Sequence, residues 1–179
     1  MVFPNPMTIL VCPLSEVMNI IATRTPERIV SLLDPELVFP DAGPAYVGRH
    51  LCLRFHDVHL SGNGQVAPTA RHIDELLAFL SGWGQSAPIL IHCRAGISRS
   101  TATAFITACL HNPRADELEI AAALRRASSL ARPNGKLIEL ADAALGRNGR
   151  MTQAIIETGR RLPWIEVYEN VLFEMPSVY

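Results

Sequence analysis

The chain has 179 residues, which is enough for one hydrophobic core and short for two domains. Its formal net charge of −1 argues against a protein that binds nucleic acid or an anionic membrane surface through overall basic character. Hydrophobic residues make up 49% of the chain and aromatic residues 6%, as in a folded globular protein rather than a disordered or fibrous one.

Three apolar runs in the first half of the chain predict buried strands, at residues 8–12, 28–33 and 51–55. Apolar residues at helical spacing predict a helix over residues 14–23 and another over residues 69–81, which glycines terminate. Prolines and glycines indicate irregular structure over residues 37–49. Residues 61–65 are expected to form a loop with unusual backbone angles.

The second half begins with a strand-like apolar run at residues 88–92, followed after a short loop by a mostly apolar helix that we expect to be buried. Three more helical patterns follow, at residues 116–130, 135–145 and 151–158. Residues 160–179 include Trp164, Tyr168 and Phe173, so we expect this tail to dock against the body, in a conformation that the sequence leaves open. The order of elements predicts one α/β domain over residues 1–179, with a helix-rich C-terminal half.

Four cysteines are far apart and include no Cys-x-x-Cys pair: Cys12, Cys52, Cys93 and Cys109. This spacing indicates neither a zinc site nor a dense disulfide framework, so we expect reduced thiols, no metal and no cofactor. The N-terminus has no basic leader, and no apolar run approaches the length of a membrane span. These features favour a cytoplasmic protein, and the sequence leaves its oligomeric state open.

Residues 93–99 follow the 88–92 run and read Cys-Arg-Ala-Gly-Ile-Ser-Arg. A helix N-terminus exposes N–H groups with positive partial charge, which favour both a thiolate at Cys93 and a bound phosphate. Gly96 permits close backbone approach, and Arg99 offers a planar donor fork that we expect to fold over the rim of the loop. The alternative is a buried cysteine beside an ordinary capped helix, which the full combination of residues disfavours.

The sequence His-Cys-Arg-Ala-Gly-Ile-Ser-Arg-Ser-Thr, from His92 to Thr101, closely resembles the CX5R phosphate-binding loop of the cysteine-dependent protein tyrosine phosphatases, especially their dual-specificity branch. The resemblance extends from about Leu51 through the helix after the loop. It implies a compact phosphatase-like domain with a central, mostly parallel sheet of about four to five strands flanked by helices. It also implies a metal-independent hydrolase that removes phosphate from phosphotyrosine or phosphoserine/threonine in proteins.

In this interpretation Cys93 is the nucleophile, and a phosphocysteine forms and is then hydrolysed. The residues expected to bind the phosphoryl group are the loop positions Arg94, Ala95, Gly96, Ile97, Ser98 and Arg99. The resemblance implies that Ser100 assists departure of the thiolate, and Ser100 is also a candidate cap for the following helix. Either Ser98 or Ser100 is a candidate donor to the sulfur. His92 would orient the loop through a backbone hydrogen bond, and Asn134, in a segment similar to one in dual-specificity phosphatases, is a candidate for supporting the pocket.

Asp57 is our candidate for the general acid that protonates the leaving group. It follows a predicted strand parallel to the one that ends at Cys93, so both residues would lie at the same edge of the sheet. Its distance ahead of the cysteine is also similar to that of the general acid in the family. The alternative is a turn-forming aspartate, which is also our interpretation of Asp34 and Asp41, since both lie beside prolines.

Three other functions are alternatives to a protein phosphatase. A catalytically silent phosphoprotein-binding module is disfavoured by the complete set of catalytic candidates. A phosphoinositide phosphatase stays open, because Arg94 could meet an extra acidic group although the loop lacks lysines. A metal-dependent phosphohydrolase built on His56, Asp57 and His59 is disfavoured, because strand positions three apart point to opposite faces.

Overall fold

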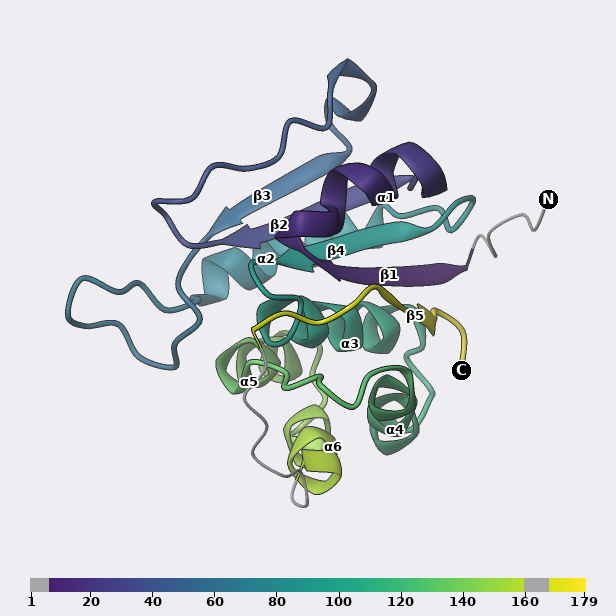
Figure 1. Ribbon diagram of the computed structural model, residues 1–179. Helices are drawn as coiled ribbons and strands as arrows, with labels where there is room; N and C mark the ends of the chain where they lie inside the picture. Colours follow the sequence, from purple (N-terminus) through teal and green to yellow (C-terminus); the bar gives the residue numbers. More distant parts are fainter. Residues whose placement is uncertain (1–6, 160–167) are drawn as a thin grey trace.

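The computed structural model describes residues 7–159 and 168–179 of the chain. Within these residues, one five-stranded sheet has the order β3-β2-β4-β1-β5 (Figure 1). Its strands are β1 (Thr8–Pro13), β2 (Arg28–Leu33), β3 (His50–Arg54), β4 (Ile89–Cys93) and β5 (Phe173–Pro176). The first four strands are parallel to one another, and β5 is antiparallel to β1 at the edge of the sheet.

The two faces of the sheet carry different numbers of helices. The helix α1 (Val17–Arg24) packs on one face. The other face is covered by α2 (Ala70–Ser81), α3 (Arg99–His111), α4 (Glu117–Ala127), α5 (Gly135–Ala144) and α6 (Arg150–Gly159). This sheet and helix arrangement confirms the predicted fold class, including the helix-rich C-terminal half.

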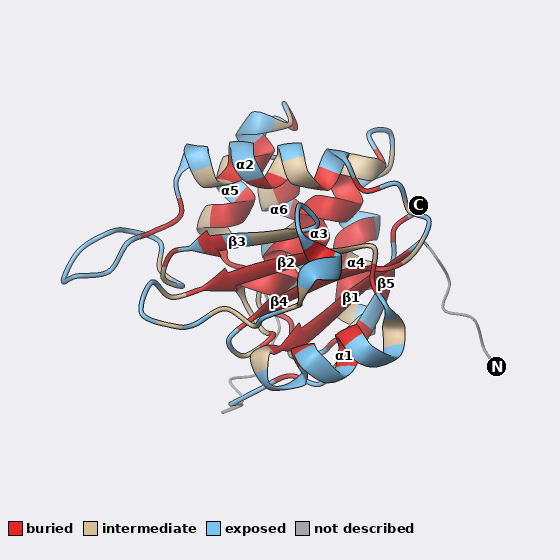
Figure 2. Ribbon diagram, turned by 90° about the horizontal axis from the view of Figure 1, so that it is seen from above, coloured by how far each residue is buried: buried red, intermediate tan, exposed pale blue. Residues whose placement is uncertain are grey.

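Side chains of the central strands are buried on both faces, as expected for a parallel sheet covered by helices. In β1, Ile9 and Val11 belong to the core under α2–α6, whereas Leu10 and Cys12 belong to the core under α1. Helix α3 is buried along most of its length, from Arg99 to Cys109, and lies among the red elements of Figure 2. The prediction of a central, buried helix after the 93–99 loop is therefore confirmed.

One segment differs from the sequence predictions, and the C-terminal tail docks in a conformation that they left open. Residues 14–16 form a short 3-10 turn, and the α-helix begins only at Val17. The C-terminal segment contains β5, in which Phe173 and Met175 are buried while the residues between and after them are exposed. This alternation is typical of an edge strand, but a run of four residues is too short to be recognised from sequence. Trp164, which we expected to help dock the tail, lies outside the described residues.

The parallel direction of β2, β3 and β4 places the loops that follow them at one edge of the sheet. These loops begin at Asp34, Phe55 and Arg94 and approach one another there. No helix in the described part of the chain is both long and apolar enough to cross a membrane.

Candidate active site

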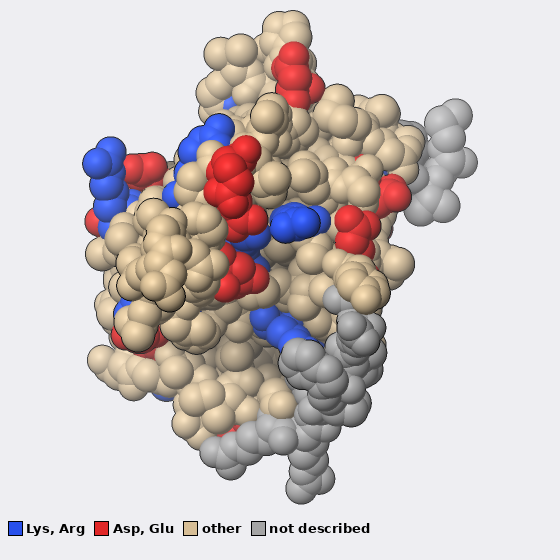
Figure 3. Space-filling view, turned by 60° about the vertical axis from the view of Figure 1, so that its left-hand side comes forward, with Lys and Arg blue, Asp and Glu red and all other residues tan. Residues whose placement is uncertain are grey.

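A pocket of about 490 Å³ opens at the edge of the sheet where β2, β3 and β4 end. Its lining combines the loop after β4 with five residues from the loops after β2 and β3, which are Asp34, Glu36, His56, Asp57 and Gln65. On this side of the molecule, Figure 3 shows acidic and basic side chains gathered around a hollow. The structure thus brings Cys93, Arg99 and Asp57 together in one pocket.

Cys93 lies at the end of β4 and is 2% exposed. Its Sγ is 3.1 Å from Ser100 Oγ, so of the two hydroxyls considered as partners for the sulfur, Ser100 is the one in contact. Ser100 does not cap the helix, because α3 begins one residue earlier, at Arg99. The cap position belongs to Ser98, whose hydroxyl makes no capping bond and donates instead to Asp57.

The backbone of the loop is shaped to receive an anion. Gly96 has a φ of +71°, and a Cβ at this position would lie only 2.9 Å from the backbone nitrogen of Pro13. A side chain would therefore strain the backbone and clash with the end of β1, which explains the glycine. No described residue accepts a hydrogen bond from the N–H groups of residues 94–98, so these donors remain for an oxyanion.

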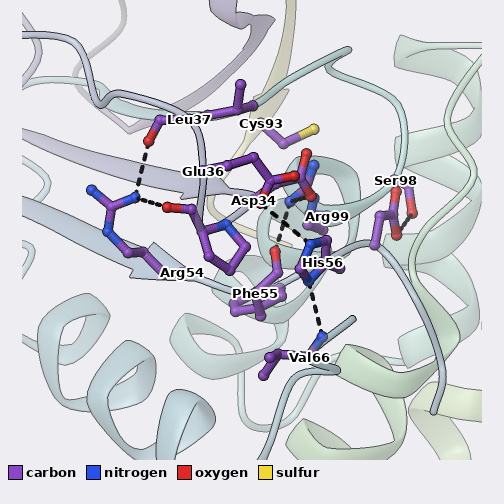
Figure 4. Close-up of polar contacts among 12 residues, drawn as sticks. Asp34, Glu36, Leu37, Arg54, Phe55, His56, Val66, Cys93, Ser98 and Arg99 are labelled. Atoms are coloured by element: carbon purple, nitrogen blue, oxygen red, sulfur yellow. Dashed lines mark hydrogen bonds and ion pairs between the residues drawn. The ribbon is translucent and has the colours of Figure 1, made fainter. Parts of the chain in front are cut away.

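Arg99 is 3% exposed and lines the pocket together with Cys93. Its Nη1 donates to Asp34 Oδ1 at 2.9 Å and to the carbonyl of Phe55 at 2.8 Å (Figure 4). Its Nε is buried and has no hydrogen-bond partner among the described residues. A buried guanidinium with one edge anchored and an unused N–H donor is suited to binding a phosphoryl oxygen.

Asp57 is anchored through one carboxylate oxygen. Its Oδ1 accepts hydrogen bonds from Ser98 Oγ and from Asn134 Nδ2, both at 2.7 Å. Asn134 also caps α5, because its Oδ1 accepts from the backbone N–H of Leu137 at 3.0 Å. None of the described residues donates to Asp57 Oδ2, so this oxygen is available to carry a proton.

Glu36 and His56 form part of the pocket wall (Figure 4). His56 Nδ1 accepts a hydrogen bond from the N–H of Val66 at 2.9 Å, so in the neutral ring the proton is on Nε2, which lies 3.4 Å from Glu36 Oε2. Arg54 Nη1 donates to the carbonyls on either side of Glu36, at 2.8 and 2.9 Å. Glu36 thus presents a carboxylate on a turn that is held in place.

His92, which directly precedes Cys93 in the sequence, is buried. Burial lowers its pKa to about 4, although the hydrogen bond to the Cys93 carbonyl acts to raise the pKa. The ring is therefore neutral near neutral pH. Its Nδ1 lies 3.4 Å from that carbonyl, while Ser31 Oγ lies 2.5 Å from its Nε2 and 2.7 Å from His50 Nε2. A carbonyl can only accept, so the proton is on Nδ1, and the chain of hydrogen bonds across β4, β2 and β3 fixes the ring.

Sequence reasoning missed four residues of the pocket: Asp34, Glu36, His56 and Gln65. Asp34 does take part in a turn, since its carbonyl accepts from Leu37 N at 3.0 Å, but its side chain anchors Arg99. The sequence did offer a signal for Asp34, which lies directly after β2. Asp57 was identified in the same way, from its position after a parallel strand at this edge of the sheet. His56 directly precedes Asp57 and carried the same signal, whereas Glu36 and Gln65 had no comparable one.

Comparison with known proteins relates this geometry to a family. The family model described as protein-tyrosine phosphatase matches residues 62–133. A comparison with curated protein sequences gave no match.

Several solved structures share the fold. The human tyrosine phosphatase-like serine/threonine/tyrosine-interacting protein has 15% sequence identity and a TM-score of 0.60, over 78% of this chain and 92% of that chain. DUSP15 has 16% identity and a TM-score of 0.52, over 91% and 96% of the two chains. PTPMT1 in complex with PI(5)P has 15% identity and a TM-score of 0.54, over 88% and 96%. The chain is thus similar to the protein-tyrosine phosphatases over residues 62–133, and it shares its fold with dual-specificity phosphatases of known structure.

Proposed function

We propose that this protein is a metal-independent phosphomonoester hydrolase that acts through a phosphocysteine at Cys93, on phosphotyrosine or phosphoserine/threonine in proteins. The observation that supports this most is the set of unused donors around one sulfur. The N–H groups of residues 94–98 and Nε of Arg99 have no partner among the described residues, and they surround the pocket that contains Cys93. A dianionic phosphoryl group would satisfy these donors and lie against the nucleophile.

In the first step, the Cys93 thiolate attacks phosphorus and the bond to the leaving oxygen breaks. Asp57 Oδ2 gives its proton to that oxygen, while Oδ1 stays bound to Ser98 and Asn134. The loop N–H groups and Arg99 bind the three equatorial oxygens as charge redistributes over them. The products of this step are the free alcohol or phenol and a phosphocysteine.

In the second step, a water molecule attacks phosphorus and gives its proton to Asp57, now a carboxylate. The bond between phosphorus and sulfur breaks, and inorganic phosphate and the Cys93 thiolate are released. The hydroxyl of Ser100, with its oxygen 3.1 Å from the sulfur, donates to the departing thiolate and lowers the cost of its negative charge.

Phosphorylated protein side chains are favoured over phosphoinositides by the charge of the pocket wall. Glu36 presents a carboxylate that is 66% exposed beside the phosphate position, where it would repel additional phosphate groups on an inositol ring. Phosphoinositides are nevertheless the second candidate substrates, because Arg94 also lines the pocket and a protein of the same fold, PTPMT1, has been solved with PI(5)P.

Residues 1–179 would act as one catalytic domain, since β5 of the C-terminal segment pairs with β1 at the start of the chain. A cytoplasmic location would keep the four cysteines reduced, and all four are free.

The test is hydrolysis of a small aryl phosphate with a metal chelator present. We expect turnover that survives chelation and disappears in Cys93→Ser and in Arg99→Ala. Wild-type turnover in Cys93→Ser would rule out the covalent mechanism, and loss of activity with chelator alone would indicate a metal-dependent enzyme. Binding of a phosphopeptide without any turnover would identify the protein as a silent binding module.

A further inference from the structure

The carbonyl groups of residues 94–98 are bound from outside the 93–99 loop. Each carbonyl from Arg94 to Ser98 accepts a hydrogen bond from an N–H donor outside the loop. The donors are Leu14 for Arg94, Asn170 for Ala95 and Gly96, Arg132 for Ile97, and Asn134 for Ser98. Because the C=O and N–H of one trans peptide unit point in opposite directions, a carbonyl drawn outward turns the next N–H inward. These external donors therefore orient the N–H groups toward the phosphate position.

Asn170 is unusual among these donors because it holds two adjacent peptide units. Its backbone N–H donates to Ala95 O at 2.8 Å, and its Nδ2 donates to Gly96 O at 3.0 Å. The orientation of its amide is fixed by its other bonds, since Oδ1 accepts from Val171 N at 2.9 Å. Nδ2 also donates to Ser128 Oγ at 3.0 Å, and Asn170 is 5% exposed. The side chain is thus a buried and fully engaged donor.

Asn170 reaches the loop because the C-terminal segment is paired with the sheet. Strand β5 begins three residues after it and pairs with β1, and Figure 1 shows this yellow segment running alongside β1. The residue before Asn170 also contacts the start of the chain: Glu169 Oε2 accepts a hydrogen bond from Ser15 Oγ at 3.0 Å. Strand β1 itself ends at Pro13, directly against Gly96. The C-terminal segment, the end of β1 and the loop therefore pack as one unit.

We propose that Asn170 is a positioning residue for phosphoryl transfer, which makes the C-terminal segment a working part of the active site. By holding the carbonyls of Ala95 and Gly96 outward, it directs the N–H groups of Gly96 and Ile97 at the phosphoryl oxygens. Asn170 itself touches no substrate. Its role in turnover rests on the function proposed above, whereas its role in binding an oxyanion can be measured separately.

The variant that tests this is Asn170→Asp, which keeps the shape and the backbone bond to Ala95 but replaces the Nδ2 donor with an acceptor facing Gly96 O. We expect the affinity for tungstate, a phosphate mimic, to fall about tenfold, and kcat for an aryl phosphate to fall by a similar factor. KM should change less, because the loop donors are most important when charge builds up in the transition state.

Asn112→Asp is the matched control. Asn112 is also buried, and its Nδ2 donates to Ser177 O of the same C-terminal segment at 2.6 Å. It follows the other end of α3, about 20 Å from the loop. The same chemical change should lower the unfolding temperature, as Asn170→Asp does, but leave tungstate affinity and kcat at their wild-type values.

Tungstate binding by calorimetry, aryl phosphate kinetics and thermal unfolding decide the outcome. Wild-type tungstate affinity in Asn170→Asp, or equal losses in both variants, would overturn the proposal. If the wild type binds tungstate without hydrolysing any phosphate ester, the proposed function is wrong and the tungstate comparison still decides the role of Asn170. If the wild type binds no tungstate, both are wrong. Should Asn170→Asp fail to fold, Asn170→Ser with Asn112→Ser as its control gives the same comparison without a new charge.

Discussion

Asp34 and the buried Arg99 form an ion pair, with 2.9 Å between Oδ1 and Nη1, that connects the end of β2 to the first residue of α3. The pair orients the guanidinium so that its Nε is left without a partner among the described residues. In Asp34→Ala, Arg99 loses this anchor, and we expect kcat/KM for an aryl phosphate to fall by about tenfold to a hundredfold.

Asp41→Ala is the control for Asp34→Ala, since Asp41 is exposed and, among the described residues, its side chain accepts a hydrogen bond only from Gly43 N. It should retain wild-type kinetics. Equal kinetics in the two variants would mean that Arg99 does not need Asp34 as an anchor.

Asp57→Asn should affect substrates according to their leaving groups. An aryl phosphate with an acidic phenol needs little protonation, so its turnover should change little, while an alkyl phosphate should lose about a hundredfold in kcat. Ser98→Ala removes one of the two hydrogen bonds to Asp57 Oδ1 and should produce the same trend with a smaller loss. A loss that is the same for all leaving groups would remove Asp57 from the role of general acid.

Glu36→Gln tests the charge of the pocket wall. Without this carboxylate, kcat/KM for a soluble phosphoinositide should rise by about threefold, while kcat/KM for an aryl phosphate with no other charged group stays constant. Glu75→Gln, at an exposed position of α2 away from this pocket, serves as the control. If the phosphoinositide is a better substrate than phosphopeptides for the wild type, the preference for proteins is wrong.

The cysteines should differ in their reactivity toward iodoacetamide in the folded protein. Burial raises the pKa of Cys12 and of Cys109 to about 12, so both stay as unreactive thiols near neutral pH. Cys93 faces the loop N–H groups and should react, and tungstate should protect it. Peptide mapping by mass spectrometry measures this order, and modification of Cys12 or Cys109 ahead of Cys93 in native protein would contradict it.

Glu117 should make stability depend on pH. Burial alone would raise its pKa, but hydrogen bonds from Arg150, its own backbone and Arg147 outweigh this effect and lower the pKa below 4.5. A carboxylate with a lowered folded-state pKa stabilises the fold above its unfolded pKa, and this contribution is lost as the pH falls through the folded value. Denaturant unfolding near neutral pH should show Glu117→Gln destabilised by about 3 kcal/mol.

In acid, the difference between Glu117→Gln and the wild type should shrink, because the wild-type carboxyl group is then protonated too. A difference that is independent of pH would mean that the ion pairs with Arg147 and Arg150 do not carry this stability.

Much of the fold follows from local sequence patterns. The strands that precede Asp34 and Cys93 are short apolar runs ended by turns, and the helix after the loop is apolar on nearly every side. The parallel arrangement of β3 with β2 and β4 places Asp57 near Cys93, so the location of the site at this edge of the sheet could be inferred before any coordinates. The CX5R pattern is equally local, because the loop residues are consecutive.

The parts that could not be predicted depend on contacts between distant residues. Asp34 is an ordinary turn residue by its neighbours, and only the tertiary fold brings it to Arg99. Asn170 reaches Gly96 because β5 pairs with β1, a contact between the two ends of the chain. The pattern of apolar and polar residues over a short stretch of sequence does not reveal such contacts between distant residues.

The most direct test of the proposed chemistry is the detection of a phosphocysteine. Wild-type protein would be mixed with an aryl phosphate in the presence of chelator, quenched rapidly in acid, and digested for mass spectrometry. The account predicts a phosphate adduct on the peptide that contains Cys93, and no adduct in Cys93→Ser. Turnover without any adduct at Cys93, together with full activity in Cys93→Ser, would contradict it.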